Sequence, residues 1–128
     1  MNLLLDTHTF IWLDIQPAML STTASSLIQQ SDVDLFLSMV SIWEMQIKIQ
    51  LGKLHLNTTL EETITSQQTI NGIRILPIMP AHIFALESLP LIHKDPFDRL
   101  LISQAKLENL VLISKDSVFK DYKIPLIW

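Results

Sequence analysis

Cysteine is absent from this chain of 128 residues, and glycine occurs only twice, at Gly52 and Gly72. Without cysteine there is no disulfide framework and no thiolate metal site. Two isolated glycines cannot form a glycine-rich phosphate loop of the Walker or dinucleotide-binding type, because those loops need several glycines close together. No two of the four histidines stand at the spacing of zinc ligands. The sequence therefore excludes disulfide-stapled folds, zinc fingers and the common nucleotide-binding loops.

Charged residues are scarce too, at 17% against 48% hydrophobic residues, and the formal net charge is −4. This balance argues against a protein that binds nucleic acid through a broad basic face, unless the acids gather in one pocket. No apolar run approaches the roughly 20 residues of a membrane helix, and the start lacks the basic flank and cleavage site of a signal peptide. We therefore expect a single domain over residues 1–128, located in the cytoplasm and without membrane contact.

What the sequence does contain is an alternation of short apolar runs and amphipathic segments. The apolar runs predict five strands, at 2–5, 34–38, 73–78, 110–114 and 124–128, the last at the edge of a sheet. The segments between them predict helices, at 7–13, 21–31, 41–51, 58–71, 80–89, 95–109 and 115–122. Continuously apolar strands separated by helices predict an α/β fold, a mainly parallel sheet of four or five strands with helices on both faces.

Four acids fall near the carboxyl ends of the predicted strands, where α/β folds bind their ligands. Asp6 and Asp116 follow the first and fourth strands, and Glu44 lies in the first turns after the second. Asp98 lies in the first turn of the helix before the fourth strand. Each also has a structural interpretation: Asp6 and Asp116 as helix caps, Asp98 as an acid that favours the dipole in the first turn of its helix, and Glu44 as the i,i+4 partner of Lys48. Close together they would repel one another by about 4 kcal/mol per pair, so they would protonate or bind a cation, and all-oxygen ligands favour Mg²⁺ or Mn²⁺.

The stretch HKDPFDRLL makes Asp98 the most informative of these acids. Asp95 suits the N-cap of the helix that begins here. On a helical wheel Asp98 falls inside the apolar arc, whereas Arg99, Ser103 and Lys106 fall on the opposite, solvent-facing side. A carboxylate on a buried face is costly unless it has a partner, so we expect Asp98 to do more than begin a helix.

Several stretches of the chain resemble PIN-domain ribonucleases, and most of all the VapC toxins of bacterial toxin–antitoxin pairs. The resemblance rests on LLLDTHTFIW, SIWEMQIKIQLGKL, HKDPFDRLLISQAKLENLVLISKD and the closing IPLIW, in this order. It covers essentially the whole chain and implies a three-layer PIN-like fold and metal-dependent endonucleolytic cleavage of RNA. It also implies that the catalytic, metal-binding quartet of the family falls on Asp6, Glu44, Asp98 and Asp116.

Other roles follow from the same resemblance. Asp95 is an extra acid of this subgroup and supports the site, and the family's small hydroxyl residue is matched by Thr7, Ser41 or Ser114. As a hypothesis, Asp6 and Asp98 would be the main ligands of one Mg²⁺ or Mn²⁺ ion. The expected partners are an RNA substrate, a small separate antitoxin and a second copy of the chain in a homodimer.

Further residues are candidates for contacts with substrate or for the core. Because lysine and arginine bind phosphates, the candidates for contacts with RNA are the four cations that flank the acids in sequence, namely Lys48, Lys94, Arg99 and Lys115. The histidines next to the acids are weaker candidates for contacts with substrate; these are His8 and His93. The three tryptophans are expected in the core; these are Trp12, Trp43 and Trp128.

Alternatives within the same fold class stay open at this point. A receiver-like phosphoacceptor domain would need paired acids after the first strand and an acceptor aspartate after a middle strand, and LLLDTH supplies one acid while IRILPIMP supplies none. A phosphatase of the haloacid dehalogenase type would want an acid where His8 stands. A PIN-like module that binds RNA but cuts it weakly or not at all would keep the same acids.

Overall fold

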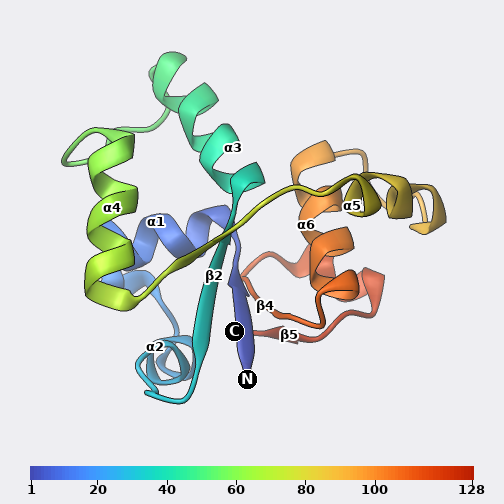
Figure 1. Ribbon diagram of the computed structural model, residues 1–128, viewed down its shortest axis with the longest axis horizontal. Helices are drawn as coiled ribbons and strands as arrows, with labels where there is room; N and C mark the ends of the chain where they lie inside the picture. Colours follow the sequence, from blue (N-terminus) through green and yellow to red (C-terminus); the bar gives the residue numbers. More distant parts are fainter.

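A computed structural model describes residues 1–128 as helices packed around a five-stranded sheet (Figure 1). All neighbouring strands are parallel, in the order β3-β2-β1-β4-β5. The strands are β1 (Asn2–Leu5), β2 (Asp34–Ser38), β3 (Arg74–Leu76), β4 (Val111–Ile113) and β5 (Leu126–Ile127). The predicted α/β class, the parallel sheet and the edge position of the last strand are confirmed. Because β1 is the central strand, Asp6, the residue that follows it, lies at the middle of the carboxyl edge of the sheet.

Helices cover both faces of this sheet. Figure 1 shows α1, α2 and α4 on one side and α5 and α6 on the other, with α3 extending beyond the end of β2. The α-helices are α1 (Thr7–Ile15), α2 (Thr22–Ile28), α3 (Met39–Gln50), α4 (Leu60–Asn71), α5 (Pro80–Phe84) and α6 (Pro96–Leu107). Short 3₁₀ helices are η1 (Pro17–Met19), η2 (Ala85–Ser88) and η3 (Ser117–Tyr122). None of these helices is long and apolar enough to cross a membrane.

The alternation of side chains along β1 divides the core in two. Leu3 and Leu5 point to one face and pack with Phe10 of α1, whereas Leu4 points to the other and packs with Leu101 and Ile102 of α6. All of these side chains are buried. The central strand is therefore fixed from both sides, which holds its carboxyl end in place.

Strands β3 and β5 are shorter than the sequence predicted, because prolines limit them. Pro77 follows β3 directly and Pro125 precedes β5, and proline has no amide hydrogen to donate to a neighbouring strand. The predicted ends of two helices agree well with the structure, since Gly52 and Gly72 adopt left-handed backbone conformations with φ of 72° and 64° just after α3 and α4.

Two predictions about side-chain exposure were wrong. Ser103 is buried rather than solvent-facing, because α5 packs on that side of α6 and the Ser103 hydroxyl donates to the carbonyl oxygen of His82 at 2.6 Å. Trp43 is 58% exposed rather than part of the core, and its ring lies edge-on against Phe97, with 5.2 Å between the ring centroids. The helical wheel assumed one buried arc for α6, whereas this helix packs against other elements on two sides.

Candidate active site

The four acids singled out in the sequence line one pocket at the carboxyl edge of the sheet. The pocket has a volume of about 160 Å³ and no hydrophobic residue in its lining. Its lining consists of Asp6, Thr7, His8, Glu44, Lys48, Asp95, Asp98 and Asp116. These residues come from the end of β1, from α1, from α3, from the start of α6 and from the segment after β4. Parallel strands bring these segments together although they lie far apart in the sequence.

Asp6 is the most deeply buried acid of the pocket, with 6% of its surface exposed. It is the N-cap of α1, accepting a hydrogen bond from the Thr9 amide at 2.8 Å. Its other carboxylate oxygen accepts a hydrogen bond from the Ser114 hydroxyl, which comes from the end of β4. Burial raises the pKa of Asp6, and the hydrogen bonds from Ser114 and Thr9 oppose that rise. The predicted cap is confirmed, and the same carboxylate faces the pocket.

Glu44 is held in the pocket by two side chains. The Thr7 hydroxyl donates to its carboxylate at 2.7 Å and also lies 2.9 Å from the hydroxyl of Ser41. Lys48 Nζ forms the predicted i,i+4 ion pair with the second Glu44 oxygen at 2.9 Å. The carboxylate keeps 15% of its side-chain surface exposed, so its structural pairing and its access to the pocket exist together.

Asp98 lies in the first turn of α6. Asp95 is the N-cap of this helix, and its carboxylate accepts hydrogen bonds from the amides of Phe97 and Asp98. His93 Nε2 lies 3.3 Å from its carboxylate, and His93 Nδ1 lies 2.5 Å from the hydroxyl of Tyr122. Burial, together with the negative charges of Asp95 and Glu44, raises the pKa of Asp98 to about 6, although the His93 hydrogen bond opposes this. The contact with His93 therefore compensates the negative charge of Asp98 only in part.

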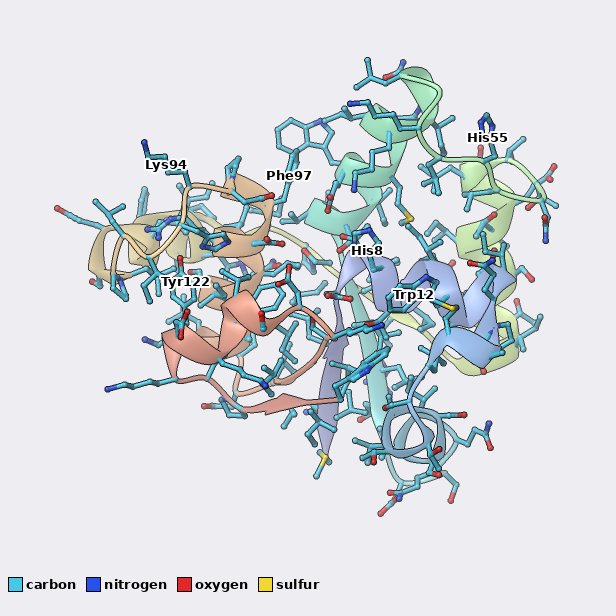
Figure 2. All side chains as sticks on the ribbon, turned by 180° about the vertical axis from the view of Figure 1, so that it is seen from behind. His8, Trp12, His55, Lys94, Phe97 and Tyr122 are labelled. Carbon is cyan, nitrogen blue, oxygen red and sulfur yellow. The ribbon has the colours of Figure 1, made fainter.

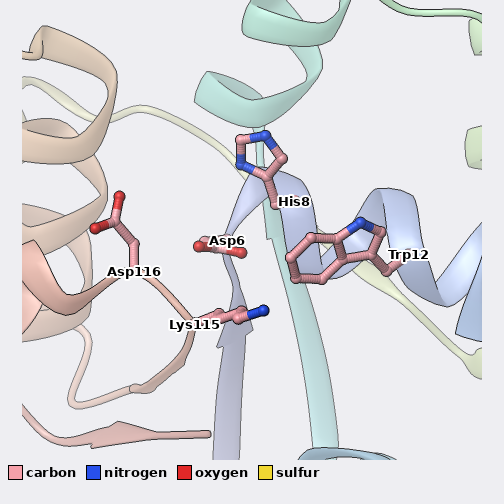
Figure 3. A pocket seen from close by; sticks show the side chains of 5 residues that line it. All are labelled: Asp6, His8, Trp12, Lys115 and Asp116. Atoms are coloured by element: carbon pink, nitrogen blue, oxygen red, sulfur yellow. The ribbon is translucent and has the colours of Figure 1, made fainter. Parts of the chain in front are cut away.

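The last acid, Asp116, is exposed and caps the 3₁₀ helix η3 by accepting a hydrogen bond from the Val118 amide at 3.1 Å. Beside it, Lys115 places its ammonium 5.9 Å from the centre of the Trp12 ring. Figure 3 shows Asp6 among His8, Trp12 and Lys115, with Asp116 on the other side of Asp6. The predicted cap is confirmed here as well.

Three of the four cations proposed for RNA contacts do not line this pocket. The Arg99 guanidinium donates to the carbonyl oxygens of Pro90 and Leu86, at 2.8 and 3.4 Å, and so ties down the segment before α6. Lys94 is exposed, and Figure 2 shows it at the periphery, away from His8. Lys48 lines the acidic pocket, and Lys115 lines a second pocket that adjoins it.

The carboxylates share the pocket without converging. No three histidine, aspartate or glutamate side chains stand close enough together to form a ready-made metal cluster. Three of the acids instead have a side-chain partner of their own, namely Ser114 for Asp6, Lys48 for Glu44 and His93 for Asp98, and Asp116 accepts from a backbone amide. The chemistry of the pocket is thus a set of oxygen donors, two of which have raised pKa values because burial outweighs their partners.

The family model described as the PIN domain matches residues 3–125. The chain belongs to the PIN domain family. A curated relative of this PIN domain is Ribonuclease VapC22 of Mycobacterium tuberculosis, which is 27% identical over 125 residues, covering 97% of this chain and 94% of the relative.

Solved structures agree with this assignment at the level of the fold. VapBC2 from Rickettsia felis, bound to a DNA fragment from their promoter, superposes with a TM-score of 0.74 at 16% identity, over 99% of this chain and 98% of that one. FitAcB from Neisseria gonorrhoeae gives 0.63 at 18%, over 100% and 97%. VapBC-1 from nontypeable Haemophilus influenzae gives 0.61 at 17%, over 99% and 97%. The PIN-like three-layer fold expected from the sequence is confirmed.

Two residues of the site had little or no specific signal in the sequence of this PIN domain. His93 was only a neighbour of the acids in sequence, yet it contacts Asp98 directly. Tyr122 was not singled out, although its hydroxyl holds His93 from a position 29 residues further along the chain. Such a contact depends on how η3 folds back against α6, which no local pattern specifies.

Proposed function

We propose that this PIN domain is a divalent-metal-dependent endoribonuclease and the toxin of a toxin–antitoxin pair. The observation that carries the proposal is the shared pocket of Asp6, Glu44, Asp98 and Asp116, which four separate segments of the chain supply. The relative named Ribonuclease VapC22, aligned over nearly the whole chain, supports RNA as the substrate. An RNA target also makes the cytoplasm the compartment that we propose, and the two core clusters support one domain over residues 1–128.

The donor set of the pocket fits a hard divalent cation. All four acids offer oxygen ligands, which suit Mg²⁺ or Mn²⁺ and not softer metals. The raised pKa values of Asp6 and Asp98 indicate that their negative charges are under-compensated, and a bound cation would relieve this. We propose Asp6 and Asp98 as the main ligands, with Glu44 and Asp116 completing the site after small side-chain rotations from their present partners.

Each residue of the chain then has a distinct task. Ser114 and the Thr9 amide fix the Asp6 carboxylate, and His93, held by Tyr122, fixes that of Asp98. Lys48 neutralises Glu44 in the free protein and can turn toward an RNA phosphate when substrate arrives.

The cation itself would supply a water of lowered pKa and positive charge at the scissile phosphate. Asp95, which raises the pKa of Asp98 and caps α6, supports the site without serving as a ligand.

Cleavage of a mixed RNA population by the purified chain tests the proposal. With Mg²⁺ we expect endonucleolytic products, with EDTA none, and with Asp98→Asn a loss of at least about 100-fold, since a ligand carboxylate is lost. Asp121→Asn is the matched control because Asp121 is an exposed aspartate outside the pocket. Cleavage that resists both EDTA and Asp98→Asn would remove the metal and this acid from the mechanism. RNA binding without any turnover would instead favour the alternative of a non-cleaving RNA-binding module.

We further propose that a small antitoxin restrains the enzyme and that the toxin forms a homodimer. The similar structures of VapBC2, FitAcB and VapBC-1, which are antitoxin complexes, support the antitoxin. The homodimer is proposed from the family resemblance alone. Co-expression with the small reading frame adjacent to this gene, followed by light scattering of the purified complex, tests both points. Failure of the adjacent product to bind or to suppress cleavage would contradict the assignment as a toxin while leaving the nuclease proposal intact.

A further inference from the structure

A second pocket of about 240 Å³ adjoins the acidic one and has a different lining (Figure 3). It shares Asp6, His8 and Asp116 with the acidic pocket and adds Trp12 and Lys115. The proposed nuclease chemistry uses neither the indole of Trp12 nor the imidazole of His8. The proposed chemistry therefore leaves the aromatic ring and the ammonium group beside these carboxylates without a function.

The Trp12 ring packs against the hydrophobic core and also lines this pocket. It packs against the hydrophobic cluster on the α1 side of the sheet and lies 5.7 Å from the Trp128 ring, at an interplanar angle of 53°. The exposed His8 lies one turn earlier on the same helix. The centroid of its ring is 5.9 Å from that of the Trp12 ring, at an interplanar angle of 42°. A ring fixed by packing and only partly buried is a preformed surface for a planar ligand, because little side-chain freedom is lost on binding.

The ammonium of Lys115 makes only a weak contact with the Trp12 ring. Its Nζ lies 5.9 Å from the ring centre, at the outer limit of a cation–π contact, and the residue is exposed. Stacking of a nucleobase on an aromatic ring is stronger than such a loose contact. A base can therefore displace the ammonium from the ring, and the freed lysine is then available for the phosphate of the same nucleotide.

A ligand that satisfies both groups is planar and aromatic on one side and anionic on the other, which describes a nucleotide. A cavity of about 150 Å³ is enough to hold a single six-membered ring, so this open pocket of about 240 Å³ leaves room for a base. The two pockets have Asp6 and Asp116 in common, which places such a base next to a phosphate lying over the acids.

We propose that Trp12, with Lys115 and His8, forms a stacking subsite for the unpaired base of the nucleotide adjoining the phosphate over the acidic pocket. The inference deepens the proposed ribonuclease function and rests on it for the identity of the ligand. Because every base has an aromatic face, the subsite selects unpaired, unstacked nucleotides rather than one particular base. It thus directs the enzyme to single-stranded segments of RNA.

Binding of two labelled probes in EDTA tests the subsite without any need for turnover. One probe is an oligoadenylate of about 12 nucleotides and the other is a ribose–phosphate chain of the same length without bases. The wild type should bind the oligoadenylate more tightly. Trp12→Leu should weaken that binding by about 5- to 100-fold and leave the abasic probe unchanged, whereas Trp12→Phe should retain most of the affinity. Trp43→Leu, which removes another exposed tryptophan, should change neither.

Equal affinity of the wild type for both probes overturns the subsite, whatever the variants do. So does Trp12→Leu if, while it folds as judged by circular dichroism, it weakens both probes alike or neither. A parallel cleavage assay with Mg²⁺ separates this result from the fate of the proposed function. Base-dependent binding through Trp12 without cleavage would end the nuclease proposal and keep the subsite, whereas cleavage with base-independent binding would do the reverse.

Discussion

Asp98 has a pKa of about 6 because it is partly buried and lies near the charges of Asp95 and Glu44. An acid whose pKa is higher in the folded than in the unfolded chain binds more protons when folded. Its contribution to stability is therefore fully present below about pH 4 and is lost as the pH rises through about 6. Burial acts in the same direction on Asp6. Without a bound cation, the folded protein is thus destabilised at neutral pH by the acids of its own pocket.

The first prediction concerns Asp98→Asn in metal-free solution. At pH 8 we expect this variant to be more stable than the wild type by on the order of 1 kcal/mol, after allowance for screening of a partly exposed group. At about pH 3.5 the difference should largely vanish, because Asp98 is then mostly protonated in both the folded and the unfolded chain. Urea denaturation at both pH values measures it, with Asp121→Asn as the control. A variant that is less stable at both pH values would show that the charge of Asp98 has favourable partners in the fold.

The second prediction concerns His93, which orients Asp98. Its Nδ1 lies against the Tyr122 hydroxyl, which leaves Nε2 as the donor to the carboxylate. Loss of such a supporting partner typically weakens metal binding by about 10- to 100-fold. We expect His93→Ala to show this loss for Mn²⁺ in calorimetric titrations, Tyr122→Phe a smaller one, and His93→Gln, which can still donate, a partial recovery. His55→Ala is the control, since His55 is exposed and lies outside the pocket. Unchanged Mn²⁺ affinity in His93→Ala would limit this histidine to a role in folding.

At the scale of elements, helix α6 combines a structural signal and a chemical one in a single turn. The Asp95 carboxylate accepts hydrogen bonds from two amides at the start of the helix, and its charge raises the pKa of Asp98. For the third prediction, Asp95→Ala should destabilise the protein by about 1 kcal/mol through loss of the cap. Asp95→Asn should retain most of the cap yet make the loss of stability above about pH 4 smaller, because one repelling charge is gone and the folded-state pKa of Asp98 moves back toward its ordinary value. Equal effects of the two substitutions would show that the cap contributes little and that the charge alone accounts for Asp95.

Local patterns predicted the elements and several of their ends, for physical reasons that can be named. Caps such as Asp6, Asp95 and Asp116 and the two left-handed glycines depend only on residues a few positions apart. The burial of Ser103 could not be predicted in this way, because it depends on α5 crossing one particular side of α6. The contact between His93 and Tyr122 was out of reach for the same reason.

At the scale of the whole molecule, the sequence predicted which acids share a pocket but not how they are held within it. The parallel sheet alone brings the strand ends and helix starts to one edge, so the grouping follows from topology. The separate partners of each acid depend on side-chain conformations that no residue pattern encodes; the ion pair between Glu44 and Lys48 is the exception, since it obeys the i,i+4 rule.

The fourth prediction links metal binding to the stability of the whole fold. A cation that binds only the folded chain stabilises it by about 2.7 kcal/mol at a free concentration of 100 times its dissociation constant. We expect Mn²⁺ to raise the melting temperature at pH 8, to do so much less near pH 5, where protons compete for Asp98, and to have little effect on Asp98→Asn. Differential scanning calorimetry with and without EDTA measures these shifts. A rise of equal size in the Asn variant would indicate that the ion binds elsewhere.

Strand β1 lies between β2 and β4, yet β4 is synthesised long after β1. Ser114 stands 108 residues after the aspartate to which it donates. At typical rates of translation the ribosome therefore delivers it about 5 to 20 s later. During that interval a nascent chain has neither a finished sheet nor an assembled set of acids. The ribonuclease proposed above therefore cannot cut RNA beside its own ribosome before β4 and β5 emerge, which leaves time for the proposed antitoxin to be ready.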